Sequence, residues 1–191
     1  MRQRGMTLIE LMVTLTVFGL LLTGVVPEMS QWMRNTRIRN AAESAQNGLS
    51  KARMEAMRRN QVITFWMVSG RTSTCALSPS SASWVVSADD PTNLCTAAPS
   101  STAAPRIVEA YGANEGASDV VVSAVDVNGA AVTSVSFNGF GQVIGAGTPI
   151  ATINLSHANV NSRSLHVTVA PGGAIRMCDP IVALPDTRAC S

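Results

Sequence analysis

The stretch GMTLIELMVTLTVFGLLLTGVVP, residues 5–27, decides the fold of this chain because its apolar character is almost uninterrupted. From Met6 to Val26 it runs for about twenty residues, and a helix of that length, at roughly 1.5 Å per residue, matches a hydrocarbon core of about 30 Å. One carboxylate, Glu10, lies inside the run. An acidic side chain in a membrane-spanning helix is costly, so we expect Glu10 to have a function.

The charges that flank this run predict its orientation. Arg2 and Arg4 precede it, and positive charge before a first spanning helix predicts a cytoplasmic N-terminus, with everything after Pro27 outside the cytoplasm. No small-residue cleavage site of the secretory kind follows Val26 closely. We therefore expect the apolar segment to remain in the protein.

Length and charge indicate one ordinary domain with an appendage. The chain has 191 residues, 46% of them hydrophobic, and a formal net charge of +2. Half of its cations cluster between residues 34 and 59: Arg34, Arg37, Arg39, Lys51, Arg53, Arg58 and Arg59. We interpret this cluster as the solvated face of a helix that also touches lipid headgroups or neighbouring subunits, with a DNA-tracking surface as the alternative.

Apolar spacing after Pro27 predicts that the helix continues to about residue 60. Apolar residues recur there at three- and four-residue intervals: Met29, Trp32, Met33, Ile38, Ala41, Ala42, Ala45, Leu49, Ala52, Ala56 and Met57. Two positions remain open for Trp32, the membrane interface or the core of the domain.

Beyond Gln61 the sequence changes to short β-branched or alternating runs that predict antiparallel strands. The runs are VITFWMV (62–68), SWVVSA (83–88), PRIVEAY (105–111), DVVVSAVDV (119–127), TSVSFNG (133–139), ATINLS (151–156) and SLHVTVA (164–170). The predicted fold is α+β, with a long N-terminal helix laid across an antiparallel sheet.

Residues 4–13, RGMTLIELMV, resemble the class III signal of type IV prepilins and type II secretion pseudopilins. The resemblance implies that prepilin peptidase cuts after Gly5 and that Met6, where the family more often has Phe, becomes the methylated first residue. It also implies that Glu10 meets the α-amino group of a neighbouring subunit, so that assembly pairs an otherwise isolated charge. The alternative is that Glu10 reaches the lipid headgroups. Pro27 matches a proline common in pilins and is expected to kink the helix.

Two later stretches, SVSFNGFGQV (134–143) and SLHVTVAPGGAIRMCDP (164–180), resemble the GspH/FimT/FimU branch of minor pilins and pseudopilins. The implied organisation is a leader peptide (1–5), a transmembrane helix (6–26), its amphipathic continuation (27–60) and a periplasmic β-rich domain (61–191). The expected location is the bacterial inner membrane, crossed once, with later incorporation into a pilus or pseudopilus.

Four cysteines show no C-x-x-C pair and no histidine at ligand spacing, so neither a zinc site nor a redox motif is predicted. Outside the cytoplasm we expect disulfides between sequence neighbours, Cys75 with Cys95 and Cys178 with Cys190. Two other pairings of the four remain open.

No catalytic or cofactor-binding motif is found, so we expect no enzyme and no cofactor or metal. The resemblance implies a structural subunit that helps to initiate or cap a type IV pilus, in a tip or priming complex. The expected partners are the inner membrane, prepilin peptidase, other minor pilins, and the major pilin or pseudopilin. The alternative machine is a type II secretion system.

A third role is DNA binding in natural transformation, which some FimT-like minor pilins perform through a G-R-x-R motif. Here residues 173–176 read GAIR, so alanine replaces one arginine, and Arg176 and Arg188 are the possible DNA contacts. Because Asp179 and Asp186 offset these two cations, weak binding is predicted at physiological salt.

Overall fold

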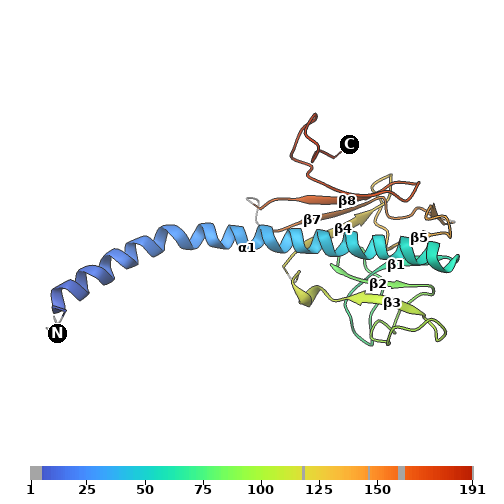
Figure 1. The fold of residues 1–191 in the computed structure, drawn as a ribbon, viewed down its shortest axis with the longest axis horizontal. Coiled ribbons are helices and arrows are strands. Elements are labelled where there is room, and N and C mark those ends of the chain that lie inside the picture. The colour runs from blue at the N-terminus through green and yellow to red at the C-terminus, as the bar shows by residue number, and fades with distance from the viewer. Residues whose placement is uncertain (1–5, 118, 146, 159–161, 191) are drawn as a thin grey trace.

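The computed structural model describes residues 6–117, 119–145, 147–158 and 162–190, except for the side chains of residues 22–27. Within these residues one helix of 52 residues, α1 (Leu8–Arg59), is followed by a short 3₁₀ turn and nine strands. Figure 1 shows the N-terminal half of α1 projecting from the domain and its C-terminal half lying across the strands. The α+β fold predicted from the sequence is confirmed.

The ends of α1 have identifiable caps. The Thr7 hydroxyl accepts a hydrogen bond from the backbone N–H of Glu10, as an N-cap does. At the other end Asn60 takes a left-handed conformation, φ 49°, and its N–H donates to the carbonyl of Ala56. The helix therefore ends at Arg59, in agreement with the end at about residue 60 that the apolar spacing predicted.

Burial on α1 begins later than the apolar spacing suggested. Its fully buried residues start at Ile38 and continue as a stripe of mostly small side chains: Ala41, Ala42, Ala45, Leu49, Ala52 and Ala56. Met29, Trp32 and Met33 stay exposed, because the domain does not cover the helix there. With 66% of its surface exposed, Trp32 does not belong to the core.

Two antiparallel sheets form the domain, whereas the sequence predicted one. The five-stranded sheet has the order β3 (Ile107–Tyr111), β2 (Ser83–Ser87), β1 (Ile63–Val68), β5 (Ser134–Phe137) and β6 (Val143–Ile144). The four-stranded sheet has the order β4 (Val121–Val125), β7 (Thr152–Ser156), β8 (Leu165–Val169) and β9 (Ile175–Cys178). α1 contacts strands of both sheets and so joins them over one core.

A close contact between α1 and the five-stranded sheet fixes how the helix lies. A Cβ atom added at Gly48 would stand 2.9 Å from both the Phe65 and the Trp84 ring. The Trp84 indole N–H donates to Ser44 Oγ at 3.0 Å, which satisfies a polar group next to the core. Small residues on the helix thus allow two aromatic rings to pack directly against its backbone.

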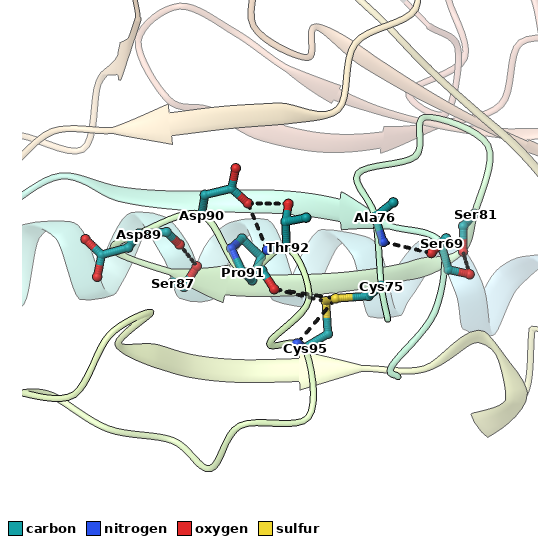
Figure 2. The surroundings of a disulfide bond; sticks show 10 residues. All are labelled: Ser69, Cys75, Ala76, Ser81, Ser87, Asp89, Asp90, Pro91, Thr92 and Cys95. Carbon is teal, nitrogen blue, oxygen red and sulfur yellow. Dashed lines mark hydrogen bonds between the residues drawn. A yellow bond between two sulfur atoms is a disulfide. The ribbon is translucent and has the colours of Figure 1, made fainter. Parts of the chain in front are cut away.

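Both disulfides join sequence neighbours and tie down segments that lack regular structure. Cys75 and Cys95 pair beneath β1–β3, in a small cluster with Val68, Val85 and Ile107. Figure 2 shows the loop around this bond, where the Asp90 carboxylate accepts hydrogen bonds from the N–H and hydroxyl of Thr92. The turn contains the sequence Asp-Asp-Pro, and Asp before Pro is typical of turns because the carboxylate can accept local hydrogen bonds.

The second disulfide, Cys178–Cys190, closes the C-terminal segment onto the end of β9. The N–H of Asp179 donates to the carbonyl of Arg188 at 2.7 Å, and Asp179 forms a parallel bridge with Ala189. The last residues described are therefore held against the four-stranded sheet by both covalent and hydrogen bonds.

Candidate assembly site

The first turn of α1 carries the carboxylate that the sequence singled out. Glu10 is exposed, and its N–H lies 3.3 Å from the Thr7 hydroxyl that accepts it. Thr7 and Glu10 have the T-x-x-E spacing of a capping box, and a carboxylate in the first turn interacts favourably with the helix dipole. This local role of Glu10 was not predicted above, although the T-x-x-E pattern of residues 7–10 indicates it.

The residues expected to be processed lie at the edge of what is described. Met6 is 67% exposed, immediately before the helix cap. Gly5, the expected cleavage position, lies outside the described residues. The side chain of Pro27 also lies outside them, so the kink expected there stays a prediction.

The N-terminal half of α1 exposes large apolar side chains around its whole circumference. Each of the following is at least half exposed: Leu8, Ile9, Leu11, Met12, Val13, Leu15, Val17, Phe18, Leu20 and Leu21. A helix that is apolar on all sides needs an apolar environment, either lipid or other helices. In the part of the chain that the structure describes, no helix meets the combined length and hydropathy expected of a membrane span.

Acidic partners accompany much of the basic cluster on the C-terminal half of α1. Arg39 pairs with Glu43 on the helix, and Arg37 and Lys51 pair with Asp119 and Glu109 of the domain. These pairs are solvent-exposed, so each contributes little to stability. Their effect here is to neutralise much of the positive face that the sequence indicated.

Near the end of α1 one carboxylate serves two arginines. Glu55 accepts hydrogen bonds from Arg58 and Arg59 at 2.7 and 2.6 Å. The hydrogen bond from Arg58 lowers the pKa of Glu55, partial burial opposes this, and Arg59 adds to the lowering. Glu55 is therefore ionised at neutral pH, and its single negative charge is shared by two arginines of the cluster.

The two arginines expected to contact DNA line different clefts, which have Cys178 in common. Arg176 is exposed on β9 and lines a groove of about 340 Å³ with Thr152 and Thr168. Arg188 lines a different cleft and donates through Nε and Nη2 to Asp186 at 3.1 and 2.8 Å. Those hydrogen bonds lower the pKa of Asp186 to about 2, so the carboxylate compensates Arg188 at any physiological pH.

Gly173, which the sequence analysis aligned with the glycine of a DNA-binding motif, has a structural reason to be glycine. Its φ is +80°, and an added Cβ would clash with the carbonyl oxygen of Gly141. The hairpin between β8 and β9 therefore requires glycine at this position, whatever Arg176 does.

One ion pair, between the exposed Arg163 and the buried Asp179, was not visible in the sequence. Arg163 donates through Nη2 to Asp179 at 2.7 Å, and its backbone N–H donates to the side chain of Asn35 on α1 at 3.0 Å. No local motif marks these residues, because they are far apart in the chain. Among the described residues no group of three or more His, Cys, Asp or Glu side chains could hold a metal ion.

Comparisons with known proteins cover both parts of the chain. The family model described as type II transport protein GspH matches residues 41–173, and the prokaryotic N-terminal methylation motif matches residues 1–26. Two crystal forms of the type IV minor pilin FimU of Pseudomonas aeruginosa are similar, at 12% identity and a TM-score of 0.48. They cover 73% and 76% of this chain and 90% and 91% of the FimU chain. None of the curated proteins matches it.

Proposed function

The chain belongs to the family of type II transport protein GspH, and on that premise we propose that it helps to initiate or cap a type IV pilus. It is a minor pilin or pseudopilin with a structural role. The proposed place of action is a tip or priming complex, reached from the inner membrane after prepilin peptidase has removed residues 1–5.

The observation that carries this proposal is the division of α1 into two unlike halves. Residues Leu8 to Leu21 expose large apolar side chains, whereas from Ile38 onward the helix is buried against two sheets. At about 1.5 Å per residue, the part from Leu8 to Met33 extends about 40 Å away from the domain. Such a helix supplies an anchor before assembly and a contact for other helices afterwards (Figure 1).

Processing changes the charge of the segment that would enter the filament. The whole chain has 14 Lys and Arg against 12 Asp and Glu, and removal of Arg2 and Arg4 leaves 12 against 12. The new N-terminus would be the α-amino group of Met6, one helical turn from Glu10. In the proposed mechanism that amino group pairs with Glu10 of a neighbouring subunit, which lowers the cost of placing either charge among apolar helices.

The test separates the charge of Glu10 from its role as a cap. Glu10→Gln keeps a capping-box side chain and removes the charge, whereas Thr7→Ala removes the cap and keeps the charge. We expect Glu10→Gln to reach the membrane fraction as the wild type does but to be reduced at least tenfold in sheared filaments.

Thr7→Ala serves as the control and should be incorporated at close to wild-type levels. Normal incorporation of Glu10→Gln into filaments would contradict the pairing mechanism. An equal loss of incorporation in both variants would assign Glu10 to helix capping alone. Gly5→Val tests the preceding step, because it should leave an unprocessed band of higher mass.

The family description favours a second machine, the type II secretion system, for the same subunit. Both machines would use the same helix, so the test is made in cells. Deletion of this chain should reduce surface pili if it serves a pilus, and should instead trap secreted enzymes in the periplasm if it serves a pseudopilus.

A further inference from the structure

A cleft of about 340 Å³ opens where α1, β8, β9 and the C-terminal segment meet. We call it the arginine cleft and define it by Arg39, Arg163, Leu165, Met177, Asp179 and Arg188. α1 contacts both β8 and β9, and the C-terminal segment lies beyond β8 in Figure 1. The roles discussed above involve only two residues of this cleft, Arg39 of the basic cluster and Arg188 of the possible DNA contacts, and none involves the cleft as a whole.

Three guanidinium groups from separate parts of the chain line the arginine cleft. Arg39 comes from α1, Arg163 from the segment before β8, and Arg188 from the C-terminal segment. Their side chains are 72%, 54% and 64% exposed. They are therefore accessible to a ligand arriving from solvent.

Each of these arginines keeps N–H groups beyond those used inside the protein. Arg39 donates through Nε to Glu43, Arg163 through Nη2 to Asp179, and Arg188 through Nε and Nη2 to Asp186. A guanidinium has five N–H donors, so these bonds leave several on each side chain. Glu43 and Asp186 are not part of the lining, and Asp179 is its one acidic member.

Asp179 is the buried residue that positions the arginines of the cleft. Only 7% of its side chain is exposed, and it accepts hydrogen bonds from Arg163 and from the N–H of Ile181. Burial alone raises the pKa of Asp179, but these bonds and the nearby Arg163 and Arg188 charges bring the pKa below its usual value. Together with the Cys178–Cys190 disulfide, this ionised carboxylate holds the arginine-bearing segments in place.

The floor of the cleft is apolar. Leu165 and Met177 are partly buried and pack against the hydrophobic core. Met177 lies on β9, the edge strand of the four-stranded sheet, and Leu165 lies on the neighbouring inner strand β8. An edge strand offers unpaired backbone groups to an extended segment, so a peptide can lie along it.

Guanidinium groups that keep unused N–H donors, although each is already paired with one carboxylate, stand over an apolar floor and select a particular chemistry. Guanidinium groups bind carboxylates through paired, charge-assisted hydrogen bonds. Leu165 and Met177 would add binding energy only for a ligand with an apolar group beside the charge. Inorganic phosphate and the DNA backbone lack such a group and would leave the floor uncovered.

We propose that the arginine cleft binds a carboxylate that stands next to an apolar side chain, at the end of an extended segment of a partner pilin subunit. This inference rests on the proposed function, which requires contacts with other pilins. It assigns one of those contacts to the region where α1 joins the domain, next to Ile38, the first buried residue of the helix.

The experiment uses the full chain in detergent micelles and isothermal titration calorimetry. The probe is a peptide, acetyl-Ala-Ala-Ala-Leu, with a free carboxylate, and it is compared with the same peptide as an amide. We expect the free carboxylate to bind at least tenfold more tightly than the amide. Hexanoate and inorganic phosphate distinguish a free organic acid or a bare anion from a peptide terminus, and both should bind more weakly than the peptide.

Arg39→Gln is the test variant, because Arg39 is exposed and its loss should not affect folding. Removing one charge-assisted hydrogen bond should weaken peptide binding about tenfold. Arg58→Gln is the matched control, since Arg58 is also an exposed, acid-paired arginine of α1 but lies outside the cleft. Its peptide affinity should equal that of the wild type.

Three results would overturn the inference: no binding of the free-carboxylate peptide, equal affinity for the amide, or equal loss in Arg39→Gln and Arg58→Gln. Tighter binding of a short DNA duplex than of the peptide, lost in Arg39→Gln, would assign the cleft to nucleic acid instead. Because the measurement needs no filament, its failure leaves the incorporation test of Glu10→Gln unaffected and is distinguishable from failure of the proposed function.

Discussion

The two halves of α1 belong to one continuous helix but use apolar residues in opposite ways. The N-terminal half exposes large side chains around its circumference, including Leu15 at 62% and Phe18 at 60%. The C-terminal half buries a narrow stripe in which Leu49 is the largest member after Ile38, and the others are alanines. The comparison shows that apolar content alone does not indicate a core. The size of the apolar side chains and the width of the apolar stripe distinguish a helix surrounded by an apolar environment from a helix that packs against a sheet.

The largest expected effect comes from the same substitution made in each half. Leu49→Ala removes a fully buried side chain and should lower the free energy of unfolding of the domain by about 2–5 kcal/mol. Leu15→Ala should change it by less than about 0.5 kcal/mol, because that position makes no contact with the domain core. Chemical denaturation of both variants measures the difference, and similar losses would contradict the division of the helix.

Glycine substitutions in the two halves of α1 compare how closely each half is packed. Gly48→Val would drive a side chain into the Phe65 and Trp84 rings and should cost about 1–3 kcal/mol of unfolding free energy. No atom lies within 4 Å of a Cβ added at Gly19, so Gly19→Val should leave the domain as stable as before. Thermal unfolding followed by tryptophan fluorescence reports both, and a stable Gly48→Val protein would mean that α1 can move away from the sheet.

Acid should loosen the packed half and its domain. The pKa values of Glu55 and Asp179 are lowered in the folded protein, so each adds stability above its unfolded pKa and loses it as the pH falls through the folded value. Asp186, with a pKa of about 2, also adds stability, and its contribution persists to a lower pH before it is lost.

We therefore expect the unfolding free energy to decline below about pH 4, after a smaller loss between about pH 7 and 5 that comes from His166, whose pKa is lowered by burial. Unfolding curves across this range check the prediction. In Glu55→Gln the decline should be shallower, and a decline unchanged by that substitution would contradict the assigned role of Glu55.

The smallest expected effect concerns the exposed ion pairs between the packed half and the sheet. Lys51 lies 3.6 Å from Glu109, and both side chains are about half exposed. Lys51→Gln should therefore change the unfolding free energy by no more than about 0.5 kcal/mol. A larger loss, measured at two salt concentrations, would show that these pairs help to hold the helix on the domain.

Local patterns explain how much of this architecture could be predicted from sequence. The predicted strand runs coincide with seven of the observed strands, because alternation and turn residues act over a few positions. The division into two sheets was not predictable in this way. β4 and β5 are consecutive in the chain yet belong to different sheets, and only contacts between distant segments decide that.

The candidate sites, too, could be predicted only where their residues are close together in the sequence. Glu10, Gly5 and Met6 were identified from one short motif, and Gly5 and the pairing of Glu10 remain predictions. The arginine cleft could not be identified, because Arg39, Arg163 and Arg188 come from three separate parts of the chain.

The sequence by itself determined the long helix, its apolar half, the family and the α+β class, because each of these depends on periodicity or on a contiguous motif. The tertiary structure alone decided where burial on α1 begins, how the strands divide between two sheets, and which charges meet. Those outcomes depend on excluded volume and charge pairing between residues far apart in sequence. Gly48 beneath two aromatic rings and Asp179 beside Arg163 are the positions where that dependence is most direct.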